Sequence, residues 1–110
     1  MSYDRLGALR HAQGDLAVAR TAYAAALALR DRLAAADPTN TEWQRDRSFC
    51  LTKLAQLHDQ LADCAAALRL TEQSLEVDER LAALDPTNVM WQADVRVSRA
   101  LVARRREKKK

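Results

Sequence analysis

Residues 32–40, with the sequence RLAAADPTN, decide the fold, because they return almost unchanged as RLAALDPTN at residues 80–88. The offset is 48 residues, and Trp43-Gln44 returns at the same offset as Trp91-Gln92. Working backwards, the same spacing aligns Leu and Ala positions and the acids Asp15 and Asp63. So many matches at one spacing mean that the chain is a duplicated unit followed by part of a third.

The composition predicts helices throughout. The chain holds 22 Ala and 16 Leu but no Ile, and only six Val and six Thr. Ala and Leu lose little free energy on entering a helix, whereas β-branched residues favour strands. With two Gly and two Pro, the 110 residues contain few helix breakers.

The turn signals divide this helical sequence into antiparallel pairs. Gly14-Asp15 predicts one helix end followed by an N-cap, and Pro38 ends the next helix. Thr39 and Asn40 can both cap the helix that follows, and the pattern Thr39-x-x-Glu42 fits a capping box. We therefore expect an all-α fold, a short α-solenoid of about five helices at residues 3–12, 16–36, 41–61, 63–84 and from 89 towards the tail. The repeat domain spans residues 1–103, with units of about 1–38, 39–86 and 87–103, and a basic tail covers residues 104–110.

The expected third helix has two distinct faces. Its apolar positions recur at helical spacing and include Leu51, Leu54, Ala55 and Leu57, with His58 on the same face as a packing residue. A single helix pair cannot bury so broad a face, but stacked pairs can. The opposite stripe is polar and consists of Thr52, Gln56, Asp59 and Gln60.

At this point the first unit resembles the tetratricopeptide repeat family. The residues that carry the resemblance are Leu6-Gly7, Gln13-Gly14-Asp15, Ala19, Tyr23 and Ala26-Leu27. In that family, Gly and small Ala residues lie where two helices cross closely, and the aromatic side chain fills the gap between them. The period here exceeds the family's usual ~34 residues, and the chain is similar to long-helix variants found in multidomain bacterial proteins.

The resemblance implies a protein-binding scaffold. Partners of the family lie in a groove formed by the first helix of each pair. By position, the partner-binding residues are Thr52, Lys53, Gln56, Asp59, Gln60 and Arg104, with Asp4, Ala8, His11 and Ala100 beside them.

The residues that could carry chemistry do not form a catalytic pattern. Cys50 and His58 are eight residues apart on one expected helix, roughly 12 Å along its axis, which is too far for a nucleophile and its base. We expect no enzyme activity, no cofactor, no metal site and no Cys50–Cys64 disulfide. The acids are interpreted as a solvated face with i,i+4 pairs. The tryptophans are interpreted as equivalent, largely buried packing residues, with a platform for a ligand as the alternative. These residues are Asp31, Asp46, Asp78, Glu79 and Asp94, and Trp43 and Trp91.

The basic C-terminal tail indicates an alternative function, the binding of anions. Residues 96–110 carry eight Arg or Lys and one acid, while residues 1–95 are mildly acidic. The tail could bind the phosphates of nucleic acid or an acidic membrane, although neither is expected to be the main partner. It lacks aromatic stacking residues, so we do not expect it to read a nucleic-acid sequence. The sequence shows neither a secretory signal nor an apolar run of membrane length, so we expect a cytoplasmic protein. The fifth helix carries Val95, Val97 and Val102 with no later helix to cover them, which predicts self-association through uncovered ends.

Overall fold

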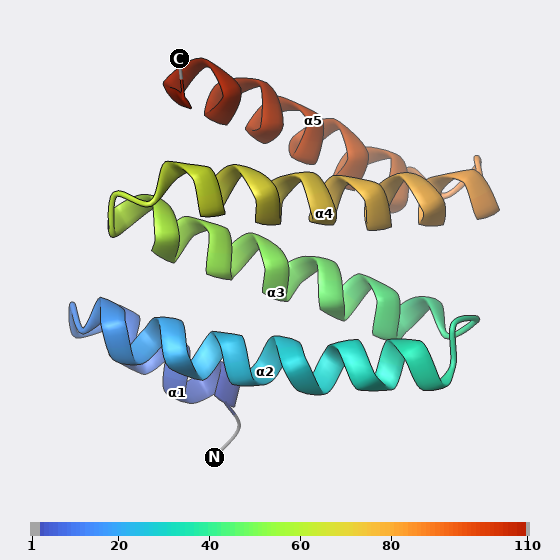
Figure 1. Cartoon of the computed structure of the whole chain (residues 1–110). Coiled ribbons are helices and arrows are strands. Elements are labelled where there is room, and N and C mark those ends of the chain that lie inside the picture. Colours follow the sequence, from blue (N-terminus) through green and yellow to red (C-terminus); the bar gives the residue numbers. More distant parts are fainter. Residues whose placement is uncertain (1–2, 110) are drawn as a thin grey trace.

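The computed structural model describes residues 3–109, and the side chains of all of these except Asp4, Lys108 and Lys109 (Figure 1). Its helices are α1 (Tyr3–Ala12), α2 (Leu16–Ala36), α3 (Thr41–Gln60), α4 (Cys64–Leu84) and α5 (Val89–Lys109). Residues 3–109 contain no strand. The predicted all-α fold of five helices is confirmed, and the expected ends of its helices agree with the observed ones to within a residue. None of these helices combines the length and the apolar character needed to cross a membrane.

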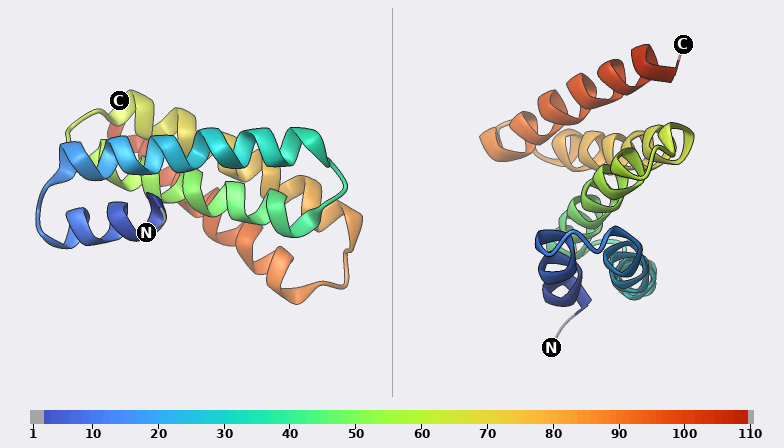
Figure 2. Two further views of the ribbon diagram at one scale, coloured as in Figure 1. Left: turned by 90° about the horizontal axis from the view of Figure 1, so that it is seen from below. Right: turned by 90° about the vertical axis from the view of Figure 1, so that its left-hand side faces the viewer.

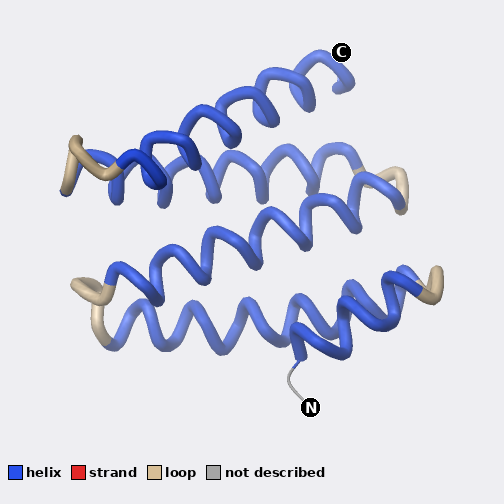
Figure 3. The backbone as a smooth tube through the Cα atoms, turned by 180° about the vertical axis from the view of Figure 1, so that it is seen from behind, coloured by secondary structure: helices blue, strands red, loops and turns tan. Residues whose placement is uncertain are grey.

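The helices form a stack in which the backbone of each described helix lies beside those of its neighbours in the sequence, α1 beside α2, α2 beside α3, α3 beside α4 and α4 beside α5. The turns alternate between the two ends of the molecule (Figure 3), so that successive helices are antiparallel. The stack measures 39 × 37 × 20 Å (Figure 2). This arrangement has the one-dimensional character of a solenoid.

The helix starts are capped by acid or amide side chains. Asp15 and Asp63 accept from the backbone N–H groups of Val18 and Ala66. The predicted capping box is wrong, because Asn40 is the N-cap of α3 and accepts from Trp43 N–H at 3.0 Å. Thr39 instead belongs to the turn, where its hydroxyl donates to Asp37 at 2.8 Å, and the second copy of the turn repeats both interactions.

The core is built on the α3 face that the leucine spacing predicted. Leu51, Ala55 and Leu57 have no exposed surface, and Leu54 is buried with them. At the first helix crossing, an ideal Cβ on Gly7 would lie 2.8 Å from the ring of Tyr23. The close approach of glycine and aromatic residue that the family resemblance implied is therefore present.

Candidate binding face formed by α1, α3 and α5

Side chains join the three odd-numbered helices, although their backbones do not pack on one another. His11 Nε2 on α1 lies 2.7 Å from Gln60 Oε1 on α3. Arg105 on α5 lies 3.0 Å from the Asp59 carboxylate on α3. These links form the floor of a surface that we call the α1–α3–α5 face, and the spaces between the helices leave hollows in it.

The central hollow contains most of the predicted partner-binding residues. Its volume is about 420 Å³, and residues of all three odd-numbered helices line it. Four of the predicted residues come together there, in company with polar and apolar neighbours that the prediction did not include. The lining consists of the predicted Gln56, Asp59, Gln60 and Arg104, together with His11, Leu101 and Arg105.

The other two predicted residues lie in neighbouring hollows. Lys53 is exposed and lines a hollow between α1, α2 and α3, which it shares with Arg5, Arg30 and Asp46. Thr52 is half-buried against α4, where its hydroxyl lies 3.1 Å from Ser74 Oγ. The polar stripe predicted on α3 is therefore divided, because Thr52 also serves the interface between helices. The side chain of Asp4 lies outside the described residues.

Arg105 is a buried cation beside the central hollow. Its residue is 6% exposed, its Nε donates to Thr71 Oγ1 at 2.9 Å, and Asp59 supplies the opposite charge. The 48-residue offset places it where α3 has the buried Leu57, so the repeat itself marked the position as interior. The helix thus continues past residue 103, where we expected the tail to begin. The side chains of Lys108 and Lys109, and the whole of Lys110, lie outside the described residues.

Asp78 anchors a buried polar cluster between α3, α4 and α5. It is 4% exposed, and its carboxylate accepts from Ser48 Oγ at 2.6 Å and from Ser98 Oγ at 2.5 Å. Burial raises the pKa of Asp78, and the two hydroxyl donors oppose that shift. The prediction that Asp78 lies on a solvated face is wrong. The repeat carried a partial signal for this cluster, since Ser74 and Ser98 stand where the preceding unit has Ala26 and Cys50, whereas Asp78 stands where it has the charged Arg30.

Three other acids also bridge helices instead of pairing at i,i+4. Arg45 Nε donates to Asp94 at 2.9 Å, and this hydrogen bond raises the pKa of the Arg45 guanidinium above its ordinary value. Two more links join α3 to α2 and α5 to α4. They are Arg47–Asp31 at 2.6 Å and Arg99–Glu79 at 3.9 Å. These acids therefore connect neighbouring helices, while Asp31, Glu79 and Asp46 are all exposed, as predicted for a solvated face.

Cys50 and His58 pack between helices and are not arranged as a reactive pair. Cys50 is buried, and its thiol donates to the Tyr23 carbonyl at 3.4 Å. Both Cys50 and Cys64 are free thiols. His58 is partly buried, as predicted, with its Nδ1 3.6 Å from the Asp63 carboxylate, which is too long for a hydrogen bond. Among the residues described, no group of three or more potential ligands is placed to hold a metal ion.

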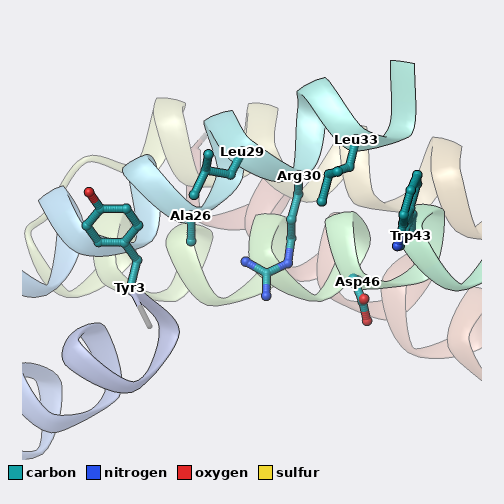
Figure 4. A pocket seen from close by; sticks show the side chains of 7 residues that line it. All are labelled: Tyr3, Ala26, Leu29, Arg30, Leu33, Trp43 and Asp46. Atoms are coloured by element: carbon teal, nitrogen blue, oxygen red, sulfur yellow. The ribbon is translucent and has the colours of Figure 1, made fainter. Parts of the chain in front are cut away.

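The two tryptophans occupy equivalent places but are less buried than predicted. Trp43 and Trp91 both begin a helix after an Asn cap, and both are only partly buried. Trp43 lines a groove at the α1 end of the stack (Figure 4). The chain matches no family model, no curated protein and no solved structure.

Proposed function

We propose that the chain is a protein-interaction module that binds a peptide or protein segment along the α1–α3–α5 face. The observation that carries the proposal is the central hollow, where Gln56, Asp59, Gln60 and Arg104 meet. The resemblance to tetratricopeptide repeats had pointed to these positions, and the hollow brings them together from two helices.

The chemistry of the hollow suits a polypeptide. Gln56 and Gln60 are exposed amides that can both donate and accept, as the backbone of a bound segment requires. Arg104 is an exposed cation, while Leu101 adds an apolar contact. Buried Arg105 is held in place by Asp59 and Thr71, so part of the floor is already ordered before binding. Such ordering lowers the entropic cost of association.

The potentially reactive side chains are not arranged as a nucleophile and its base, which favours binding over catalysis. Cys50 is buried and donates to a backbone carbonyl, and His58 is eight residues away on the same helix. We therefore assign no catalytic step to the chain.

The test is affinity capture with matched surface variants. Gln56→Ala combined with Gln60→Ala should remove partners that the wild-type protein retains, because both side chains are exposed and their loss should not unfold the chain. Glu72→Ala combined with Gln73→Ala, on the exposed side of α4, is the matched control and should retain them. Each captured partner is then purified and its affinity measured by calorimetry. Equal affinities for both double variants would refute the proposal.

Anion binding by the tail has less support. Arg105 is buried, and Arg106 lies 3.1 Å from Glu72. We expect heparin and anionic vesicles to bind weakly, with an affinity that falls steeply as salt increases. Tight binding that survives physiological salt and is lost on Arg104→Gln would favour this alternative instead.

A further inference from the structure

Another hollow of the α1–α3–α5 face lies between α3 and α5, and we call it the α3–α5 hollow. Its volume is about 120 Å³, and it adjoins the central hollow, because Leu101 lines both. Its walls are apolar and come from both helices, with Phe49 on α3 and Val97 and Leu101 on α5. A space of this size suits a single side chain, since a cavity of roughly 150 Å³ holds a benzene molecule.

The walls of the α3–α5 hollow are accessible to a partner. Phe49 is 53% exposed and Val97 is 60% exposed, and the two stand at equivalent positions of successive units. We expected Val95 and Val102 to be uncovered together with Val97, but both are buried. Of these three valines, Val97 alone is available to a partner, and it lies on the proposed binding face.

The floor of the α3–α5 hollow is a buried carboxylate. Asp78 is 4% exposed, and its oxygens accept from the hydroxyls of Ser48 and Ser98, which line the hollow with it. Both donors are neutral, and no Lys or Arg among the described residues forms an ion pair with Asp78, because the Arg45 guanidinium is bonded to Asp94. A carboxylate can accept about four hydrogen bonds. Since buried charges in proteins are usually paired, Asp78 has both the charge and the spare acceptor sites for a cation that enters the hollow.

The charges around the hollow also favour a cation. The charged side chains that line it are Arg45, Asp78 and Asp94. Arg45 and Asp94 neutralise each other at 2.9 Å, and the guanidinium covers one face of the Phe49 ring, 4.9 Å from its centre. The charge of Asp78 is left uncompensated. A cation beside it would stabilise the ionised carboxylate, which burial disfavours.

We propose that the α3–α5 hollow binds a lysine side chain of the protein partner, with its methylene chain between Phe49 and Val97 and its ammonium group donating to Asp78. This inference rests on the function proposed above, because it names the chemistry of the segment that the α1–α3–α5 face binds. Lysine fits better than arginine, since an ammonium group is a compact charge with three donors, whereas a guanidinium is wide and planar. The methylene chain suits the apolar walls.

The probe is n-butylammonium, which has the atoms of a lysine side chain. It is titrated into the isotope-labelled full chain and followed by NMR. We expect saturable shifts at the amides of Phe49, Val97 and their neighbours, with a dissociation constant on the order of 1–10 mM for so small a ligand. 1-Butanol has the same size but no charge, and it should bind at least about tenfold more weakly.

Matched protein variants place the cation at Asp78. Asp78→Asn keeps the size of the side chain but removes its charge, and it should weaken n-butylammonium about tenfold or more. Glu79→Gln is the control and should leave the affinity unchanged, because it removes an equal charge from the adjacent residue, whose exposed side chain lines a different hollow. Phe49→Ala combined with Val97→Ala, at two exposed sites, should also weaken the probe about tenfold, which keeps the inference testable if Asp78→Asn does not fold.

The same variants apply to a partner that the wild-type chain captures. Asp78→Asn should weaken that partner about tenfold, and acetylation of the partner's lysines should do the same, because it removes their charge. Full affinity after either change would refute the inference.

Three results with the probe would also overturn the inference. They are no saturable shift up to about 100 mM n-butylammonium, equal affinity for 1-butanol, and equal affinity of the folded Asp78→Asn protein. All three concern the α3–α5 hollow. The proposed function is tested at Gln56 and Gln60 of the central hollow, so a failure of that function is distinguishable from a failure of the inference.

Discussion

A single methyl group added at Gly7 tests how tightly α1 crosses α2. The new Cβ would lie 2.8 Å from two ring carbons of Tyr23, where ordinary contact begins at 3.4 Å. The ring must therefore move by about 0.6 Å or more. Overpacking of this kind costs about 1–3 kcal/mol, whereas replacing a glycine in a helix by alanine contributes about 1 kcal/mol of stability. We expect Gly7→Ala to lower the free energy of unfolding by up to about 2 kcal/mol.

The effect of Gly7→Ala on the free energy of unfolding should have the opposite sign once the Tyr23 ring is removed. In a Tyr23→Thr background the added methyl meets no ring, so Gly7→Ala should raise stability by about 1 kcal/mol. The second unit holds this solution, since Ala55 and Thr71 occupy the two positions and are buried.

The assay for both backgrounds is urea unfolding followed by circular dichroism. An osmolyte in every sample keeps the Tyr23→Thr protein folded. Hydrogen exchange of the α1 amides shows whether α1 detaches locally or the whole chain unfolds. If Gly7→Ala changes stability equally in the two backgrounds, the ring and the glycine do not touch as described, and the reasoning fails.

Three further predictions concern the buried charges and the tryptophans. Because burial raises the pKa of Asp78, the folded state holds this proton more tightly than the unfolded state does, so ionisation should cost stability as the pH rises from the ordinary aspartate value through the raised one. Asp78→Asn should remove that loss, and urea unfolding at several pH values would contradict us if the wild type gained stability over the variant across this interval. Arg105→Gln should destabilise the fold by about 1–3 kcal/mol because it leaves buried partners unpaired. Arg104→Gln, at an exposed site, should cost under about 0.5 kcal/mol. Equal losses of stability in thermal unfolding would show that Arg105 is not held in the interior. Trp43→Ala and Trp91→Ala should each cost about 1–3 kcal/mol, less than a fully buried tryptophan would, and clearly unequal losses would contradict their equivalent environments.

The helices were predictable because the repeat shows each boundary signal twice. Gly14-Asp15 and the Asp-Pro-Thr-Asn turns mark ends that the structure places within a residue of the expected ones. The assignment of Thr39 to a capping box was wrong because its hydroxyl donates to Asp37 in the turn, and Asn40 caps the helix instead. Local sequence does not decide between two adjacent residues that can both serve as caps.

The candidate face was only partly predictable. Helical spacing grouped Gln56, Asp59 and Gln60 on one stripe, because that grouping depends on one helix alone. The burial of Asp78 and Arg105 depends on how neighbouring helices are rotated relative to each other, and the sequence of a single helix does not determine that rotation. Comparing the units position by position would have marked Arg105, whose counterpart is Leu57 on the predicted apolar face, but not Asp78, whose counterpart is the charged Arg30.

The crossings of the two hairpins are filled in different ways, and this restricts how such chains can be rearranged. Gly7 faces the large Tyr23 ring, while the matching positions of the next hairpin hold Ala55 and Thr71. A gene exchange within a hairpin would set alanine against tyrosine, which overfills the crossing, or glycine against threonine, which leaves a void. An exchange in the turn between α2 and α3 keeps each pair together. Whole hairpins, cut at the Asp-Pro-Thr-Asn turn, are therefore the pieces that duplication can copy and recombination can shuffle without loss of packing.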